Sequence, residues 1–190
     1  MMDTTPHLRD YRLLILACSA RKRPDPGRIP ARDRYDGPLW RTLRVTDRNG
    51  VLAKVGFLSA RFGFRGDDTP IENYDARLTR ELADRMIAGG MITRWPRPPS
   101  PNRPDNCGMH PGAEIASLSL IRGGRVPFRD VALVGGALYV EVMRAFVAGF
   151  QGMGCVAEDA RVIEISAPIG IMRQRMAVWL KEPVRGKRSC

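Results

Sequence analysis

The sequence has few of the residues on which metal and nucleophile chemistry usually depends. Four cysteines and two histidines occur in 190 residues. The cysteines are scattered without a C-x-x-C pair, so their spacing indicates neither a zinc site nor a disulfide framework. The histidines, His7 and His110, are too few for a Ser-His-Asp set or a histidine-rich metal site. We therefore expect no metal ion and no cofactor.

Long apolar runs are also missing. No window approaches the roughly 18 apolar residues of a membrane helix, and the first ten residues lack a basic-then-apolar signal pattern. The glycine clusters spell neither a Walker loop nor a G-x-G-x-x-G fingerprint. These absences lead us to expect a cytoplasmic protein with no membrane partner. The sequence gives no indication of the oligomeric state.

Acidic residues are outnumbered by basic ones. Lysine and arginine total 31 against 20 aspartates and glutamates, which gives a formal charge of +11 and a pI near 10.4. Such an excess favours a polyanionic partner, because binding to phosphates releases condensed counterions. The alternative is an arginine-rich but ordinary solvated surface. We expect nucleic acid as the partner, DNA before RNA.

The chain does contain a regular alternation of strand and helix patterns. Its 190 residues, 44% of them hydrophobic, are enough for a single domain, 1–190, with a full core. Near-continuous apolar runs predict four strands, each followed by a helical pattern: 11–17, 55–59, 130–134 and 162–165. This order predicts an α/β fold, a three-layer α-β-α sandwich with a mainly parallel central sheet of about four strands.

Capping residues and prolines set the expected helix boundaries. Asp36 and Asp75 are predicted N-caps, with Pro38 in the first turn after Asp36. The prolines of 93–112 exclude a regular helix or a central strand there, which leaves an ordered surface loop or a flexible insertion. Residues 181–190 form a basic tail.

Small residues follow all four predicted strands. Cys18-Ser19, Ser59-Ala60, Gly135-Gly136 and Ser166-Ala167 would share one rim if the strands are parallel. Ligands of open α/β sheets bind at that rim, where small residues expose backbone amides and helix N-termini favour anions. Tight strand-to-helix turns alone would also require small residues. The candidate substrate-binding residues are Cys18, Ser19, Lys22, Tyr35, Ser59, Tyr74, Gly136 and Tyr139.

The tyrosines of this set each lie near an expected helix start, where a ring can stack on a base. Packing in the core is the alternative for such rings. Arg21, Arg173 and Arg175 are the candidate phosphate ligands, against the alternative of a solvated basic face. Cys18 precedes cations that would favour a thiolate, but no base accompanies it. We therefore expect Cys18 to be a positional residue and not a nucleophile.

Three acids follow the second predicted strand. Breaking an N-glycosidic bond builds positive charge on the sugar, which a carboxylate stabilises while it orients the attacking water. Asp67, Asp68 and Asp75 are the candidate catalytic residues, because they flank the loop leaving the predicted carboxyl edge. Asp75 is favoured, beside Tyr74, although a helix cap would explain it equally well.

Short, ordered motifs connect these residues. They are Cys18-Ser19-x-x-Lys22, Ala31-Arg32-Asp33-x-Tyr35-x-x-Pro38-Leu39-Trp40, Leu58-Ser59-Ala60-x-x-Gly63 and Ile71-x-x-Tyr74-Asp75-x-x-Leu78. In these motifs the chain resembles the YaaA-like group, which comprises the bacterial peroxide-stress protein YaaA and related bacterial and phage domains. Asn73 stands where relatives commonly have proline, and Arg65-Gly66-Asp67 replaces a more apolar stretch.

The resemblance implies association with DNA and protection from oxidative damage. The Cys-Ser-x-x-Lys signature is similar to one in archaeosine-forming enzymes, which act on a 7-deazaguanine base in transfer RNA, and the three-layer arrangement resembles uracil-DNA glycosylases. We therefore expect a nucleobase-recognising enzyme acting on nucleic acid, most plausibly an N-glycosylase or base-modifying enzyme for a modified base. The alternatives are a non-catalytic DNA-binding stress-protection protein and a hydrolase or transferase for a free nucleotide.

Overall fold

The computed structural model describes residues 7–97 and 109–183. Most of the expected proline loop, 98–108, and most of the basic tail, 184–190, lie outside these residues, as do Cys107 and Cys190. At the edges of these segments, Pro111 already belongs to a helix and Lys181 ends one, so both irregular segments were predicted slightly too long.

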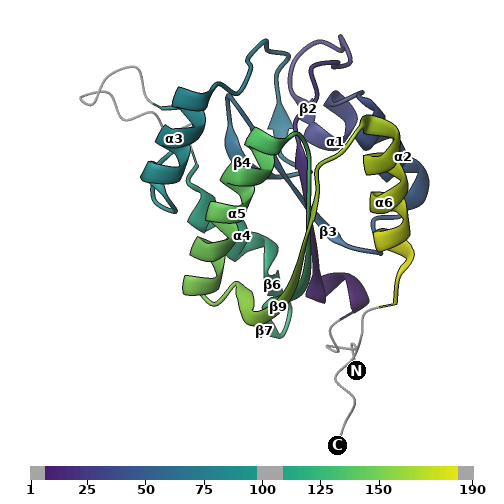
Figure 1. Cartoon of the computed structure of the whole chain (residues 1–190), viewed down its shortest axis with the longest axis vertical. Helices are drawn as coiled ribbons and strands as arrows, with labels where there is room; N and C mark the ends of the chain where they lie inside the picture. Colours follow the sequence, from purple (N-terminus) through teal and green to yellow (C-terminus); the bar gives the residue numbers. More distant parts are fainter. Residues whose placement is uncertain (1–6, 98–108, 184–190) are drawn as a thin grey trace, which may run out of the picture.

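A five-stranded sheet forms the middle layer, in the order β4-β3-β1-β8-β9 (Figure 1). The four parallel strands are those predicted, and the fifth, β4, runs antiparallel at the edge. The prediction of an α/β fold with a mainly parallel sheet is confirmed, with one strand more than expected. The strands are β1 (Arg12–Ala17), β3 (Lys54–Ser59), β4 (Gly63–Gly66), β8 (Phe128–Val134) and β9 (Val156–Ile165).

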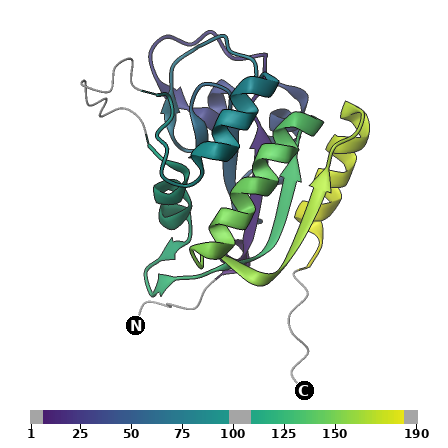
Figure 2. The same ribbon diagram turned by 60° about the vertical axis from the view of Figure 1, so that its left-hand side comes forward.

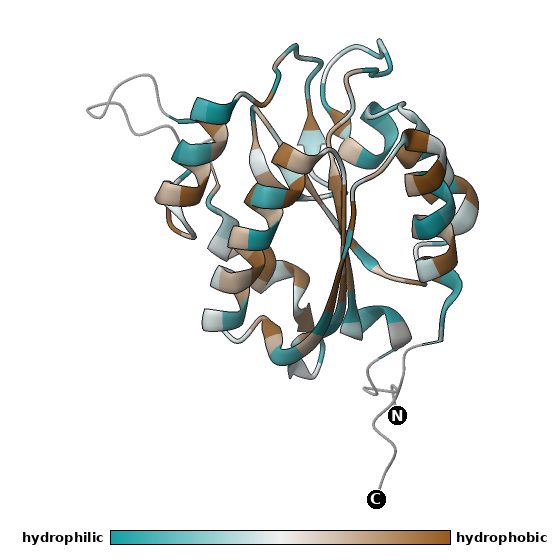
Figure 3. Cartoon of the chain, viewed as in Figure 1, coloured by the Kyte–Doolittle hydropathy of each residue, from teal (hydrophilic) through white to brown (hydrophobic). Residues whose placement is uncertain are grey.

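Helices cover both faces of the sheet. On one face lie α3 (Arg80–Gly89), α4 (Pro111–Leu118) and α5 (Ala137–Gly152), and Figure 2 brings α3 and α5 forward, side by side. On the other face lie α2 (Pro38–Thr46) and α6 (Ile169–Lys181). Each face has its own apolar core, and the central strands between them are the most hydrophobic part of the ribbon (Figure 3).

Short elements complete the chain, most of them close to the sheet ends. They are a 3-10 turn (Leu8–Tyr11), β2 (Ile29–Pro30), α1 (Ala31–Arg34), β5 (Pro70–Ile71), β6 (Leu120–Ile121) and β7 (Gly124–Arg125). β2 pairs with β5, which ties the loop after β1 to the segment that precedes Tyr74.

The segment after Ser59 is a β-hairpin and not a loop at the carboxyl edge. Gly63 takes a φ of +64° in the turn, and Gly56 leaves room for the Phe64 ring, which would lie 2.6 Å from a side-chain carbon at position 56. The hairpin returns the chain to the amino end of β3, where the amide of Asp67 donates to the carbonyl of Val55.

Two predicted helix caps are wrong. The helix expected after Asp75 begins at Arg80, because the hydroxyl of Thr79 accepts the amide of Leu82 and takes the capping role. At α2 the N-cap is Gly37, since Asp36 is turned toward arginine side chains instead. Pro38 does occupy the first turn, as predicted.

Candidate functional site

The switch in strand order falls between β1 and β8. The chain passes from β1 to its neighbour β3 on one side, while β8 lies on the other side, so connections leave the two strands in opposite directions. Such a switch point opens a crevice at the carboxyl ends of the strands. Gly135 is required there, because a side-chain carbon at this position would lie 2.7 Å from that of Ala17. The segments that leave β1 and β8, which were predicted from their small residues, therefore lie close together.

A cluster of hydroxyl, thiol and amino groups lies at this rim. We call it the tyrosine cluster, and it contains six of the eight predicted substrate-binding residues: Cys18, Lys22, Tyr35, Ser59, Tyr74 and Tyr139. They come from five segments of the chain, so only the fold brings them together. The sequence singled out each of them from an expected strand end or helix start, although the helix expected directly after Tyr74 begins only at Arg80.

Tyr74 is the centre of a hydrogen-bonded chain. Its hydroxyl lies 2.8 Å from Ser59 Oγ and 2.6 Å from the Tyr35 hydroxyl. Ser59 Oγ already accepts the amides of Arg61 and Phe62, so its own proton is available for the Tyr74 oxygen. This orientation leaves a proton between Tyr74 and Tyr35 that can point either way.

Cys18 joins the second half of the cluster. Its Sγ lies 3.2 Å from the hydroxyl of Tyr139, on the first turn of α5. Burial is the main cause that raises the pKa of Tyr74 and of Tyr139 above the ordinary value, and it raises that of Tyr35 as well. The three tyrosines are therefore neutral at physiological pH and act as donors and acceptors, not as anions.

Lys22 lies against the face of Tyr74. Its Nζ is 4.1 Å from the ring centroid, a cation–π contact, and its backbone bridges to that of Tyr35. Burial lowers the pKa of Lys22, while Cys18 and Asp75 act in the opposite direction. Among the residues that the structure describes, no carboxylate lies within ion-pair distance of Lys22. A partly desolvated cation at a strand exit favours a ligand that brings negative charge.

A cavity of about 350 Å³ opens beside the tyrosine cluster. Cys18, Ser19 and Arg21 line it on one side, and Pro38 and Ile169, at the starts of α2 and α6, line it on the other. Gly37 is needed at its edge, because a side-chain carbon there would lie 2.2 Å from Ser19 Oγ. This volume suits a small planar ligand. Gly136, the remaining predicted residue, is exposed at the start of α5 with open space above it.

Tyr35 does not offer a stacking surface. Its side chain is fully buried, with its ring 4.9 Å from that of Trp40 and 5.3 Å from that of Phe57. The ring of Tyr35 therefore packs in the core, as the alternative proposed, and only its hydroxyl reaches the tyrosine cluster. Tyr74 and Tyr139 are partly buried, with part of each side chain open at the rim.

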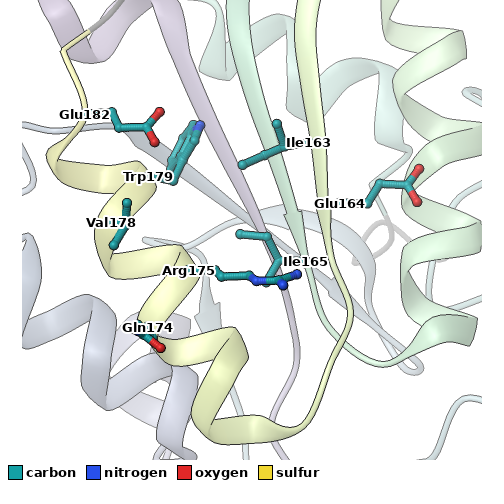
Figure 4. A pocket seen from close by; sticks show the side chains of 8 residues that line it. All are labelled: Ile163, Glu164, Ile165, Gln174, Arg175, Val178, Trp179 and Glu182. Carbon is teal, nitrogen blue, oxygen red and sulfur yellow. The ribbon is translucent and has the colours of Figure 1, made fainter.

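The predicted phosphate ligands are not brought together. Arg21 pairs with Asp36 at 3.2 Å, and Arg173 donates to the hydroxyl of Thr42 on α2. Arg175 lies elsewhere, in a groove between α6 and β9 (Figure 4). Its side chain lies beside Ile165, the last residue of β9, and its role as a phosphate ligand stays a prediction.

Sequence reasoning missed an arginine group around Asp36. Arg21, Arg41 and Arg44 all approach this one carboxylate, and the hydrogen bond from Arg41 is the main cause that lowers the pKa of Asp36 to about 2. The i, i+3 spacing of Arg41 and Arg44, following an acid, was the available signal. The group keeps two positive charges in excess beside the cavity.

The predicted catalytic acids separate. Asp75 is exposed near Lys22, as its effect on the pKa of that lysine indicates. Asp67 and Asp68 lie at the opposite, amino end of β3, because the hairpin reverses the chain, so their predicted place at the carboxyl edge is wrong. Burial raises the pKa of Asp67 to about 6, although Arg32 approaches it at 3.7 Å.

Within the described residues no group of three or more histidine, cysteine or acidic side chains is arranged to hold a metal ion. None of the helices described has the length and apolar character needed to span a bilayer. No protein-family model, curated protein or solved structure matches the chain. The similarity to the YaaA-like group therefore rests on the motifs alone.

Proposed function

We propose that this chain is a nucleobase-recognising enzyme whose ligand binds at the tyrosine cluster and the adjacent cavity. The observation that carries the proposal is the convergence of Lys22, Tyr74 and Ser59 at the carboxyl ends of β1 and β3, beside the switch point of the sheet. Neutral hydroxyls that both donate and accept suit the mixed edge of a base, and a partly exposed ring suits its face. This combination supports a nucleobase as the class of ligand.

The reaction we propose is hydrolysis of an N-glycosidic bond. Of the three candidate acids, Asp75 is the one at the rim, where its side chain is exposed and acts on Lys22. Its carboxylate would stabilise positive charge on the sugar and orient water for attack at the anomeric carbon. The bond from that carbon to the base nitrogen breaks, the base leaves with a proton, and the sugar gains the hydroxyl.

A second candidate is a hydrolase or transferase for a free nucleotide. It is favoured by the pairing of basic residues near the rim with acids: Arg21 with Asp36, Arg23 with Asp25, and both Arg28 and Arg61 with Glu72. Paired arginines neutralise few phosphates of a polymer, whereas the excess charge around Asp36 suffices for one compact phosphate.

The deciding experiment follows release of free base by mass spectrometry. The protein is incubated with modified and unmodified DNA, RNA and nucleotides, and we expect release from one of these classes. Asp75→Asn should lower the rate at least a hundredfold, about 2.7 kcal/mol of barrier, with ligand binding and melting temperature nearly unchanged. Asp68→Asn is the matched control, since it removes the same charge at the far end of β3.

The salt dependence of binding separates the two candidates. A protein that binds duplex DNA through phosphates loses affinity with a log–log slope of about 0.9 per phosphate neutralised. A steep slope supports the nucleic-acid enzyme, and a shallow slope with turnover of nucleotides supports the second candidate. Normal turnover by Asp75→Asn would contradict the carboxylate mechanism, and absence of base release from every substrate would contradict the glycosidic reaction itself.

A further inference from the structure

The outer edge of β9 is open in the described part of the chain. β9 forms one border of the five-stranded sheet and, within residues 7–97 and 109–183, pairs only with β8. Its first half is irregular, because the register with β8 shifts between the pairs that hold Val156 and Arg161. The regular half, 161–165, is therefore the part that presents a straight edge. An open edge of this kind is a template for another strand.

Main-chain groups of this half point outward at two residues. The carbonyl of Ile165 accepts the amide of Gly135, so Ile165 and Ile163 direct their main-chain groups to β8. Residues between them alternate, so Val162 and Glu164 direct theirs away from the sheet. Two such residues placed symmetrically about Ile163 match the geometry of an antiparallel pair with a second copy of the same segment.

A groove runs beside this edge, with a cavity of about 400 Å³ between β9 and α6. Figure 4 shows Ile163 and Ile165 pointing into it from the strand, opposite Trp179 and Arg175. Val178 on the same helix is 54% exposed, and Val162 on the strand is 37% exposed. Exposed aliphatic side chains beside an open strand form an apolar surface, and such surfaces often mark sites of protein association.

The charged side chains along one face of α6 complement the same face of a second, antiparallel copy. Ile171, Arg175, Val178 and Glu182 recur at intervals of four, three and four residues, so they form one stripe on the helix. In Figure 4 Arg175 lies beside Ile165, while Glu182 lies at the other end of the groove, beyond Ile163. No carboxylate among the described residues forms an ion pair with Arg175. Glu182 pairs with Arg161 of its own chain at 2.8 Å, and both of these side chains remain partly exposed.

We propose that two copies of this chain associate through their β9 edges about a twofold axis at Ile163. Antiparallel pairing places Val162 opposite the second copy's Glu164, and the two sheets become continuous. The same axis brings Val178 next to its own equivalent and places each Arg175 near the opposite Glu182. The interface is isologous, so pairing closes after two copies and leaves no open edge at β9.

The test measures mass in solution by sedimentation and by light scattering over a range of concentrations. We expect the protein to be a dimer at about 100 μM, the range in which even weak specific interfaces form. Val178→Lys should raise the dissociation constant at least about tenfold. Val45→Lys is the matched control, because Val45 is 76% exposed on α2, and the same change there should leave the dimer intact.

A charge exchange tests the orientation of the two copies. Arg175→Glu and Glu182→Arg should each weaken the dimer, since like charges then meet across the axis, and the double variant should restore it. A wild-type protein that remains monomeric at this concentration would overturn the proposal. A dimer that is insensitive to Val178→Lys, or a double variant no better than the singles, would overturn it equally. The base-release assay is independent of all these outcomes.

Discussion

The two ends of the sheet bury charge in opposite ways. At the amino end Arg12 is completely buried, and its side chain donates to Asp130 and to the carbonyls of Trp179 and Leu180 at the end of α6. Trp179 stacks on the Arg12 guanidinium and donates its indole N–H to the second oxygen of Asp130. Each of the three guanidinium nitrogens of Arg12 has an acceptor, so these contacts tie β1, β8 and α6 together.

At the carboxyl end Lys22 has no ion-pair partner among the described residues, and the exposed Asp75 acts on it only from a greater distance. Lys22 is partly buried against the Tyr74 ring, and the neighbouring hydroxyls and the thiol satisfy one another without involving it. The network around Arg12 stabilises the fold, whereas the ammonium group of Lys22 stays available to a ligand. The difference indicates that removing a charge should cost stability at one end and ligand binding at the other.

The largest effect is expected from Asp130→Asn. It leaves the Arg12 guanidinium buried without its counter-charge, which costs about 3–5 kcal/mol of unfolding free energy. Urea denaturation measures the loss. Glu141→Gln, which breaks an exposed pair with Arg80, should cost no more than about 1 kcal/mol. A loss below about 1 kcal/mol for Asp130→Asn would remove the contrast between the two ends.

The pH dependence of stability sharpens the comparison at the amino end. The pKa of Asp67 is raised to about 6, mainly by burial, so its protonated form stabilises the fold. That stability is present below about pH 4, where the unfolded carboxyl is protonated, and is lost as the pH rises through about 6. Arg32, Arg9, Lys54, Asp68 and Glu114 surround this carboxyl.

The stability of Asp67→Asn relative to the wild type should therefore increase as the pH rises. The difference in unfolding free energy between variant and wild type should grow by up to about 3 kcal/mol between pH 4 and 7.5, since two pKa units correspond to that energy. Urea titrations at several pH values measure it. Asp68→Asn, at an exposed side chain, should show no comparable growth. A constant difference for Asp67→Asn would contradict the burial of an ionisable carboxyl.

Lys22→Met tests the carboxyl end. Methionine keeps the apolar stem against Tyr74 but removes the charge, so unfolding free energy should change by less than about 1 kcal/mol. Turnover or ligand affinity should fall at least about tenfold, because the uncompensated cation is gone. Arg23→Met, at an exposed arginine paired with Asp25, serves as the control. Loss of stability without loss of function would place Lys22 with the structural charges.

The smallest effect is expected from Cys18→Ser. Serine keeps a hydrogen bond to the Tyr139 hydroxyl, and the tyrosine cluster contains no histidine that would act as base for a nucleophilic thiol. Activity should stay within about tenfold, or 1.4 kcal/mol of barrier. Complete loss of turnover in a folded variant, or a covalent adduct on Cys18 detected by mass spectrometry, would show that the thiol takes part in the chemistry.

The amino-acid sequence alone determined the layered fold and most of the rim. Near-continuous apolar runs identify parallel strands because both faces of such strands are buried, and small residues after them locate the exits. Cys18 and Ser59 were found in this way, whereas Tyr74 and Tyr139 were singled out because they lie near expected helix starts. These signals are local, since each depends on residues adjacent in the chain.

Only the tertiary structure decided where the charged side chains lie. The sequence did not reveal that the chain turns back after Ser59, because Gly63 and Phe64 acquire their roles from Gly56 on the paired strand. That reversal moved Asp67 and Asp68 to the far end of the sheet. Thr79 likewise displaced Asp75 as the cap, and the facing of α6 turned Arg175 toward β9. Charge positions depend on contacts between distant segments, which no local pattern encodes.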